Sequence, residues 1–522
     1  MKHKLYMPGN ALALLPAVIF LLFLFGMMVK TGGNGAVETI KGTELSFSGF
    51  ENLSYDFEES LQGQCYQKEF FINLNGLTTR ILGIHSLNQR QKLENGCLSY
   101  DEEIIDITDP GERVIGLHNF LQKKGIDFLY VLAPTAASIY DAQFAPGYES
   151  DARENITNMV QLLSEAKVNV INVDALYEEN GLGSQDVLFK TDHHWRPEGA
   201  FFATHKSLQY MRDVFGIDYD NSMADFSVWD VVKYEDCFLG SHGKRVGSQY
   251  AGVDDISIIR RKGLGTVSFS CLHRDGTWSY PNSLFKDSYL WEPDYFNQNP
   301  YAAYLGGDYP LAVIKNDQAL NQKRVLVIGD SFRLPVETFL ASYFTELYHL
   351  DTRYYTDGTV AQFVDEIQPE LVLMYTYEYG LSKEDRYQFG VEEYQEAKAA
   401  FQNQEAPVFL GELSLDAGDN DQTFLLAFSN LAPGTLYTFT IDGVSLQGGD
   451  SAYVQMTLQD LSDNKEVCSR YFETDCKQSQ KWIFMTGAED HTYAVYLYAG
   501  TKGHTAGLSV SLEGVCLEKG IS

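Results

Sequence analysis

The chain is poor in basic residues: it has 39 Lys and Arg against 71 Asp and Glu in 522 residues, which gives a formal net charge of −32. A surface this acidic disfavours nucleic acids, and it repels strongly anionic polymers unless cations intervene. We therefore expect no nucleic-acid partner. If the protein binds a polymer, the charge favours a neutral one.

Cysteine is also scarce, with seven residues and no Cys-x-x-Cys spacing. Without that spacing, neither a zinc ribbon nor thioredoxin-type chemistry is indicated. Three pairs of neighbours along the chain could form disulfides, but the odd count leaves at least one thiol free or joined to another chain. The pairing stays open among Cys65 with Cys97, Cys237 with Cys271, and Cys468 with Cys476.

Long apolar runs are missing except at the N-terminus, where residues 11–29 form 19 positions without a charge, preceded by Lys2 and Lys4. This length just spans a bilayer, and the flanking lysines place the N-terminus in the cytoplasm. A cleaved signal peptide is the alternative, but no Ala-x-Ala follows closely. We expect a single-pass membrane anchor in residues 1–30, a polar tether with a small N-terminal extension in 31–109, and the bulk of the chain extracytoplasmic.

The stretch 326–334 begins with a short apolar run that predicts a buried strand leading into Gly329-Asp330-Ser331, and residues 335–344 then have a helical pattern. A serine at such a strand-to-helix turn exposes its hydroxyl at the C-terminal edge of a parallel sheet. The N–H groups at the start of the helix can hold a developing oxyanion. The three-residue string alone recurs by chance and often only makes a turn. Ser331 is our candidate nucleophile.

A second motif, residues 191–197, reads Thr-Asp-His-His-Trp-Arg-Pro. One residue separates Asp192 from His194, so the carboxylate can reach Nδ1–H of the imidazole while Nε2 faces a serine. Pro197 opens a helical stretch, and a loop at a helix start commonly carries active-site groups. Asp192 could instead cap that helix. A zinc site lacks other ligands at suitable spacing, so we expect no metal and no cofactor.

Together, Asp192-His193-His194-Trp195 and the downstream Gly329-Asp330-Ser331-Phe332 resemble the DHHW family and the related alginate O-acetyltransferase-like proteins. These belong to the SGNH hydrolase-like superfamily, here with the motif order permuted. The resemblance covers residues 110–385 and implies an SGNH-like (flavodoxin-like) fold. It also implies Ser331 as nucleophile, His194 as general base and Asp192 as its orienting acid.

The same resemblance implies transfer of an acetyl group through Ser331 to a hydroxyl of a cell-surface or secreted polysaccharide. The acetyl donor would then arrive through a membrane-bound O-acyltransferase partner. The alternatives are a carbohydrate acetylesterase and a non-catalytic glycan-binding scaffold. An intact set of Asp192, His194 and Ser331 argues against the scaffold.

The surrounding sequence independently indicates an α/β domain, which we place in residues 110–402. Short apolar runs alternate with helical stretches, which predicts a parallel sheet with helices on both faces; the runs are 128–133, 168–173, 324–328, 346–350 and 371–375. Ligands bind at the carboxyl ends of such strands. The candidate substrate-binding residues are Trp195, Arg333, Tyr375 and Tyr377, with Pro134, Thr135, Arg353, Tyr354 and Tyr355 as further strand-end residues. Each could instead simply cap a strand end.

An insertion, residues 213–322, separates the two motifs. A structureless loop of this length inside a compact domain is improbable, so we expect a cap with a few strands. Its Trp229, Trp278 and Trp291 could shape a glycan groove or form a small core. The segment Gly240-Ser-His-Gly resembles the loop that closes over the site in the same family.

From residue 403 to the end, short alternating apolar runs separated by Asn, Asp, Gly and Pro predict an antiparallel β-sandwich of jelly-roll type. Such a module resembles a carbohydrate-binding module. Trp482, Tyr496 and Tyr498 are candidates for sugar stacking, and strand alternation puts the two tyrosines on one face. Packing within the sandwich is the other interpretation of these rings.

Overall fold

The computed structural model describes the chain from residue 68 onward, with gaps. The described residues are 68–100, 102–291, 294–392, 394–395, 408–417, 422–428, 431–441, 443–447, 452–463, 465–472, 480–487, 491–501 and 508–519. The expected anchor in residues 11–29 lies outside these ranges, as do Cys65 and Cys476. Within them, no helix combines the length and the apolar character that crossing a membrane requires.

An eight-stranded sheet forms the centre of the α/β domain, in the order β5-β4-β13-β11-β12-β10-β8-β9. The first five strands are parallel: β5 (Val170–Asn172), β4 (Asp127–Ala133), β13 (Leu371–Tyr377), β11 (Asn321–Gly329) and β12 (Phe344–Leu350). These are the strands that the apolar runs predicted.

The sheet is mixed, which corrects the expectation of a wholly parallel one. Three antiparallel strands extend it beyond β12: β10 (Leu311–Lys315), β8 (Ser268–Leu272) and β9 (Trp278–Ser279). All three come from the insertion. Antiparallel neighbours need no crossover helix, so an insertion without long helices can add strands only in this way.

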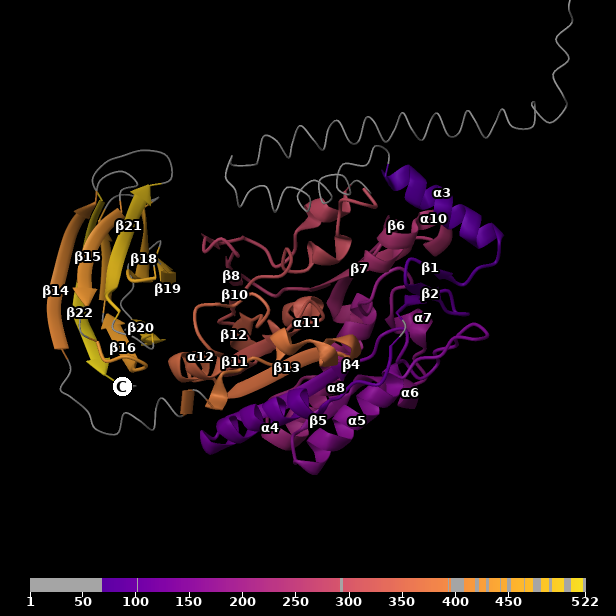
Figure 1. Ribbon diagram of the computed structural model, residues 1–522, viewed down its shortest axis with the longest axis horizontal. Helices are drawn as coiled ribbons and strands as arrows, with labels where there is room; N and C mark the ends of the chain where they lie inside the picture. The colour runs from indigo at the N-terminus through magenta and orange to yellow at the C-terminus, as the bar shows by residue number, and fades with distance from the viewer. Residues whose placement is uncertain are drawn as a thin grey trace, which may run out of the picture. The chain divides into compact units, whose positions relative to one another are not determined.

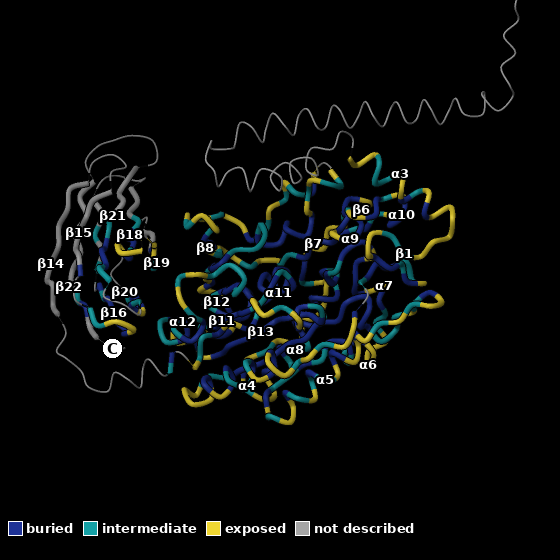
Figure 2. The backbone as a smooth tube through the Cα atoms, in the orientation of Figure 1, coloured by how far each residue is buried: buried dark blue, intermediate teal, exposed yellow. Residues whose placement is uncertain are grey.

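Helices cover both faces of the sheet, as predicted (Figure 1). Alternate residues of β11 and β13 point to opposite faces of the sheet. Val327 and Leu373 lie in one apolar cluster, and Leu326 and Val372 lie in the other. The first cluster includes residues of α6 (Val173–Glu179), α8 (Pro197–Phe215) and α11 (Arg333–Leu340), and the second those of α4 (Thr108–Lys123), α5 (Ala152–Glu165) and α12 (Val360–Ile367). Figure 2 shows the central strands buried between these layers.

The insertion is more firmly built into the domain than a separate cap would be. Besides the three sheet strands, it forms a two-stranded sheet of β6 (Trp229–Phe238) and β7 (Asp254–Arg261). Trp229 is buried in the main core and its indole N–H donates to the Met223 carbonyl at 2.7 Å. Trp291 is 72% exposed. The three tryptophans therefore do not form one glycan groove.

Part of the expected tether is folded. It contains α3 (Lys68–Ile81) and the short strands β1 (Ser86–Leu87), β2 (Arg90–Lys92) and β3 (Leu98–Ser99). Described residues up to 88 form one compact unit with residues 243–252, which include α10 (Ser248–Ala251). Within this unit, a Cβ at Gly76 would lie 3.0 Å from Tyr250 Cβ, so α3 and α10 need a glycine at their contact.

The C-terminal region contains two antiparallel sheets, as expected for a β-sandwich. One holds β14 (Val408–Ala417), β22 (Leu508–Lys519), β16 (Leu436–Ile441), β20 (Gln480–Met485) and β17 (Gly443–Gln447); the other holds β15 (Gln422–Phe428), β21 (Tyr493–Thr501), β18 (Ala452–Asp460) and β19 (Lys465–Phe472). Trp482 is 3% exposed and packs 5.5 Å from the Phe439 ring. It is a core residue, which argues against sugar stacking by this side chain.

Two of the suggested disulfides are not formed. Cys97, Cys237 and Cys271 are buried free thiols. Cys237 lies in β6 and Cys271 in β8, which belong to different sheets. Burial raises the pKa of the Cys97 thiol to about 12, so this group stays protonated and unreactive at neutral pH.

A buried carboxyl follows β13. Glu378 is fully buried, and its oxygens lie 3.4 Å from Asn155 Nδ2 and 3.4 Å from Thr135 Oγ1. Burial, and then the nearby charge of Glu102, raises the pKa of Glu378 well above the ordinary glutamate value. Since the folded pKa exceeds the unfolded one, the free energy of unfolding falls as pH rises from the unfolded value through the folded one.

We predict that Glu378→Gln removes this decline. A neutral amide keeps the shape without the buried charge, so the variant should be more stable than wild type at pH 8 by on the order of 1–3 kcal/mol. Urea unfolding at pH 5 and pH 8 measures the difference. Exposed Glu112→Gln is the matched control and should show no such pH-dependent gain. Equal pH dependence in wild type and E378Q would contradict the prediction.

Candidate active site

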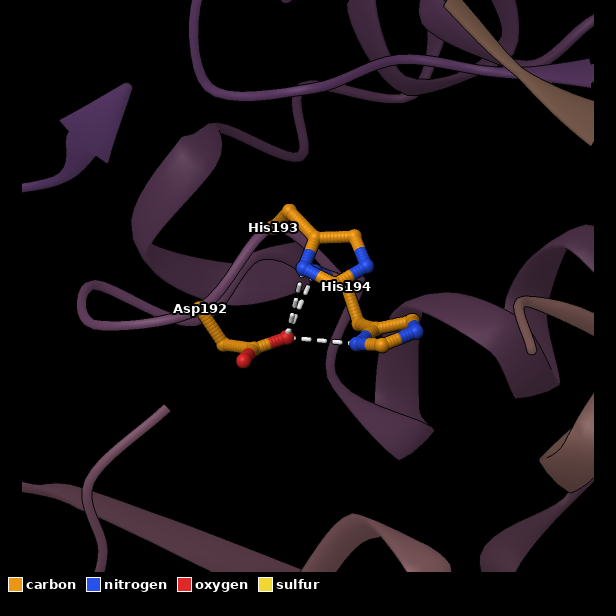
Figure 3. Close-up of side chains that lie close together, drawn as sticks. All are labelled: Asp192, His193 and His194. Carbon is orange, nitrogen blue, oxygen red and sulfur yellow. Dashed lines mark hydrogen bonds and ion pairs between the residues drawn. The ribbon is translucent and has the colours of Figure 1, made fainter. Parts of the chain in front are cut away.

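The structure brings Asp192, His194 and Ser331 into one line of hydrogen bonds. His194 Nδ1 lies 2.5 Å from Asp192 Oδ1, and His194 Nε2 lies 2.6 Å from Ser331 Oγ. Ser331 comes from the turn between β11 and α11, whereas Asp192 and His194 come from the turn before α8. Figure 3 shows the Asp192 carboxylate facing both His193 and His194.

The loop between Leu188 and Pro197, which carries Asp192 and His194 and is called the acid–base turn below, is closed by backbone contacts. An isolated bridge pairs Leu188 with Trp195, and the Arg196 N–H donates to the Val187 carbonyl at 2.7 Å. Pro197 then begins α8 at the position where a missing N–H costs nothing. The sequence prediction of a loop at a helix start is confirmed.

Asp192 is held ionised. Burial raises the pKa of its carboxyl, but the nearby imidazoles of His193 and His194 and the hydrogen bonds from His194 and Ser241 outweigh burial and hold the pKa well below its usual range. The Ser241 N–H donates to Asp192 Oδ2 at 2.6 Å. An ionised Asp192 accepts from Nδ1–H of His194, which leaves Nε2 free to accept the proton of Ser331.

His193 is a different kind of imidazole from its neighbour. Burial, together with the nearby His194, lowers the pKa of His193 to about 4, so the ring is neutral at physiological pH. Its Nδ1 lies 2.9 Å from Ser241 Oγ. Its ring lies 3.8 Å from that of His194, measured between centroids.

The nucleophile turn is fixed by Asp330 and Gly329. Asp330 Oδ1 accepts the Phe332 N–H at 3.1 Å, and Oδ2 accepts Nε of Arg386 at 3.1 Å. A Cβ at Gly329 would lie 3.2 Å from the carbonyl carbon of Tyr375, so the close approach of β11 to β13 here requires glycine. Sequence reasoning missed Arg386, which lies 56 residues after Asp330 with no motif around it.

Of the four predicted substrate-binding residues, Tyr377 lies beside the candidate catalytic groups. Its ring stacks on that of Phe332 at 4.4 Å and lies 5.6 Å from His193. Trp195 is fully buried and donates its indole N–H to the Phe332 carbonyl at 2.9 Å, so it ties the two motifs together. Tyr375 is 1% exposed. Burial of Trp195 and Tyr375 argues against direct contact with a substrate.

Arg333 is also buried, with no exposed surface. Its guanidinium lies in a cluster of charged side chains from α11 and from the end of β12. There it contacts His349 and lies 3.3 Å from Asp351 and 3.5 Å from Glu337. Arg353, another strand-end candidate, pairs with the same Asp351 at 2.6 Å. These arginines balance buried acids, which explains why Arg333 does not face a ligand.

A metal could be held only by displacing the hydrogen bonds of the site. Donor atoms of Asp192, His193 and His194 lie within 4.8 Å of one another, and a second such group is Asp460, Asp463 and His491 in the β-sandwich. Both ring nitrogens of His194 already face Asp192 and Ser331. This donor set therefore fits proton transfer better than metal coordination.

Part of the chain matches a known family. Residues 101–217 match the family described as ALGX, the SGNH hydrolase-like domain of acetyltransferase AlgX. This segment is similar to that family over about a fifth of the chain. The match contains Asp192 and His194 and ends before Ser331. It supports an enzyme of the acyltransferase or esterase kind.

Among solved structures, one with a TM-score of 0.50 supports the fold over the matched part of the chain. Bacillus cereus PatB1 with a sulfonyl adduct has a TM-score of 0.50 and 21% identity over 58% of this chain and 98% of that chain. A DHHW family protein from Eubacterium siraeum gives 0.47 and 17%, over 59% and 96%. Pseudomonas aeruginosa AlgX gives 0.38 and 12%, over 83% and 94%. No curated protein sequence matches the chain.

We predict that Gly240→Ala impairs the site. A Cβ there would lie 2.5 Å from Asp192 Oδ2 and 2.6 Å from the Thr191 carbonyl oxygen, so the acid–base turn must move. A shift of about 1 Å can cost 10²-fold in rate. The measurement is kcat on an activated acetyl ester. Gly116→Ala in α4, where nothing lies within 4 Å, is the control and should keep full activity. Full activity in G240A would contradict the prediction.

Proposed function

We propose that this protein is an extracytoplasmic O-acyltransferase that passes an acetyl group through Ser331 to hydroxyls of a cell-surface or secreted polysaccharide. The observation that carries the proposal is the line of hydrogen bonds from Asp192 through His194 to Ser331. The acetyltransferase family match of residues 101–217 supports it.

In the first half-reaction, Ser331 Oγ attacks the acetyl carbonyl while His194 Nε2 takes its proton. Asp192 stabilises the imidazolium that forms. A backbone N–H of the turn into α11 would have to leave its present acceptor to hold the oxyanion, since the Phe332 N–H donates to Asp330 Oδ1 and the Arg333 N–H to the Asp330 carbonyl. When the C–O bond to the leaving group breaks, His194 returns the proton to that group, and acetyl-Ser331 remains.

In the second half-reaction, a sugar hydroxyl loses its proton to His194 and attacks acetyl-Ser331. The ester bond to Ser331 breaks, Oγ recovers the proton, and the sugar carries the acetyl group. With water in place of the sugar, the same residues perform the acetylesterase reaction, which is the alternative. The acetyltransferase family match favours transfer.

The proposed nature of the acceptor is supported by the charge of the chain. A net charge of −32 favours a neutral polysaccharide over an anionic one. We propose that the C-terminal β-sandwich binds the same polymer. With Trp482 in the core, half-buried Tyr496 is the remaining candidate whose side chain the structure describes, and stacking by Tyr498 stays a prediction.

We predict that Ser331→Ala abolishes transfer. The protein is incubated with an activated acetyl ester, with and without a neutral oligosaccharide, and products are followed by mass spectrometry. Wild type should give acetyl-Ser331 and acetylated sugar, whereas S331A should give neither, because no other group replaces its hydroxyl. Exposed Ser164→Ala is the control and should behave as wild type. Free acetate alone would favour the esterase, and no acyl-enzyme at all would favour the scaffold.

The proposed membrane anchor and its orientation rest on residues 11–29 and on the lysines before them. Since acetyl-CoA is confined to the cytoplasm, we propose that a membrane-bound O-acyltransferase partner delivers the acetyl group outside. Full-length protein should sediment with membranes and resist a high-salt wash, and its C-terminal domain should be cut by protease added to intact spheroplasts. A chain that starts at residue 31 should be released. Protection of the C-terminal domain from protease would contradict the orientation.

A further inference from the structure

The insertion between the two motifs forms hydrogen bonds with the two residues that precede Asp192. Asp254, the first residue of β7, accepts the Lys190 N–H at 3.0 Å with Oδ1. Its Oδ2 accepts both the N–H and the hydroxyl of Thr191 at 2.7 Å. Asp254 is 4% exposed, so these three donors are paired away from bulk water. A carboxylate with three such bonds holds two successive residues in one conformation.

A second contact comes from the turn after β6. The Gly240 N–H donates to Thr191 Oγ1 at 2.8 Å, and the next N–H, of Ser241, donates to Asp192 Oδ2. The Thr191 hydroxyl therefore links the Asp254 carboxylate to Gly240. The insertion thus contacts both residue 191 and the carboxylate of residue 192.

The third contact is made by a ring. Tyr301, in the 3₁₀ turn η4 (Pro300–Ala303), is 1% exposed and stacks on the His194 imidazole at 4.1 Å with an interplanar angle of 20°. The His193 ring lies 3.8 Å from the same imidazole. Two rings this close cannot share one face of an imidazole, so His194 is held from both sides. Rotation of the imidazole away from Ser331 would break the stack with Tyr301.

We propose that the insertion is a brace for the acid–base turn, with Asp254 and Tyr301 as positioning residues. Neither is placed to touch substrate; each acts through Asp192 and His194. The inference rests on the proposed function and deepens it. Catalytic side chains carried by a loop need neighbouring groups to hold them in position. A displacement of about 1 Å between base and nucleophile costs on the order of 10²-fold in rate.

The first test compares Asp254→Asn with Asp255→Asn. In D254N, an amide NH₂ replaces one carboxylate oxygen, so one of the donors that Asp254 accepts loses its acceptor. Asp255, by contrast, accepts the Asp236 N–H and pairs with Lys233, and neither of these contacts involves the acid–base turn. We expect D254N to lower kcat on an activated acetyl ester by about 10- to 100-fold with KM nearly unchanged. D255N should stay within about twofold of wild type.

The second test compares Tyr301→Phe with Tyr301→Leu. Phenylalanine keeps the ring stack on His194 and leucine removes it, so Y301F should restore most of the kcat that Y301L loses. The low-field proton resonance of the Asp192–His194 hydrogen bond gives a readout that needs no turnover. It should persist in D255N and Y301F, and broaden or disappear in D254N and Y301L.

The outcomes separate the brace from the proposed function. If wild type shows no Ser331-dependent turnover, the proposed function fails, yet the proton resonance still tests the brace. Retention of both kcat and the resonance in D254N and Y301L would overturn the brace. A loss of kcat that only follows a fall in Tm, with the resonance retained, would also overturn it, because it would show a merely structural role.

Discussion

The hydrogen bond between the Asp192 carboxylate and the His194 imidazole is the interaction on which the candidate site depends. Both side chains are more than nine-tenths buried, and a buried carboxylate is costly unless it is hydrogen-bonded. The backbone N–H groups of His194 and Ser241 offset that cost. With the carboxylate fixed, the imidazole has one orientation, and its Nε2 faces Ser331.

The nucleophile is fixed from the opposite side by the sheet. Ser331 lies two residues after Gly329, the last residue of β11, and this glycine allows β13 to approach closely. Asp330 and Arg386 hold the turn, and the buried charges around Arg333 anchor the first turn of α11 behind it. The Trp195 indole then joins this turn to the acid–base turn through the Phe332 carbonyl. The two motifs are thus joined by this hydrogen bond as well as by the one between His194 and Ser331.

Local patterns predicted much of this. Apolar runs marked the five parallel strands because strands covered by helices on both faces are apolar throughout. They did not indicate that the insertion extends the same sheet, since its fragments are short and strand pairing depends on distant partners. Arg333 illustrates the other limit. Its position two residues after Ser331 indicated a ligand contact, whereas helix geometry and the acids at Glu337 and Asp351 turned the side chain inward.

The sequence by itself determined the components of the site: the Asp-x-His spacing that lets a carboxylate reach its own neighbour's Nδ1, and the strand-to-helix turn that presents a serine. Both are set by a few consecutive residues and their backbone geometry. The tertiary structure alone decided that Ser331 meets His194 across 137 residues, that Arg386 and Tyr301 join them, and that Trp195 and Arg333 are buried. These outcomes depend on how the sheet orders its strands and on which buried charges find partners, and no local segment of the chain carries that information.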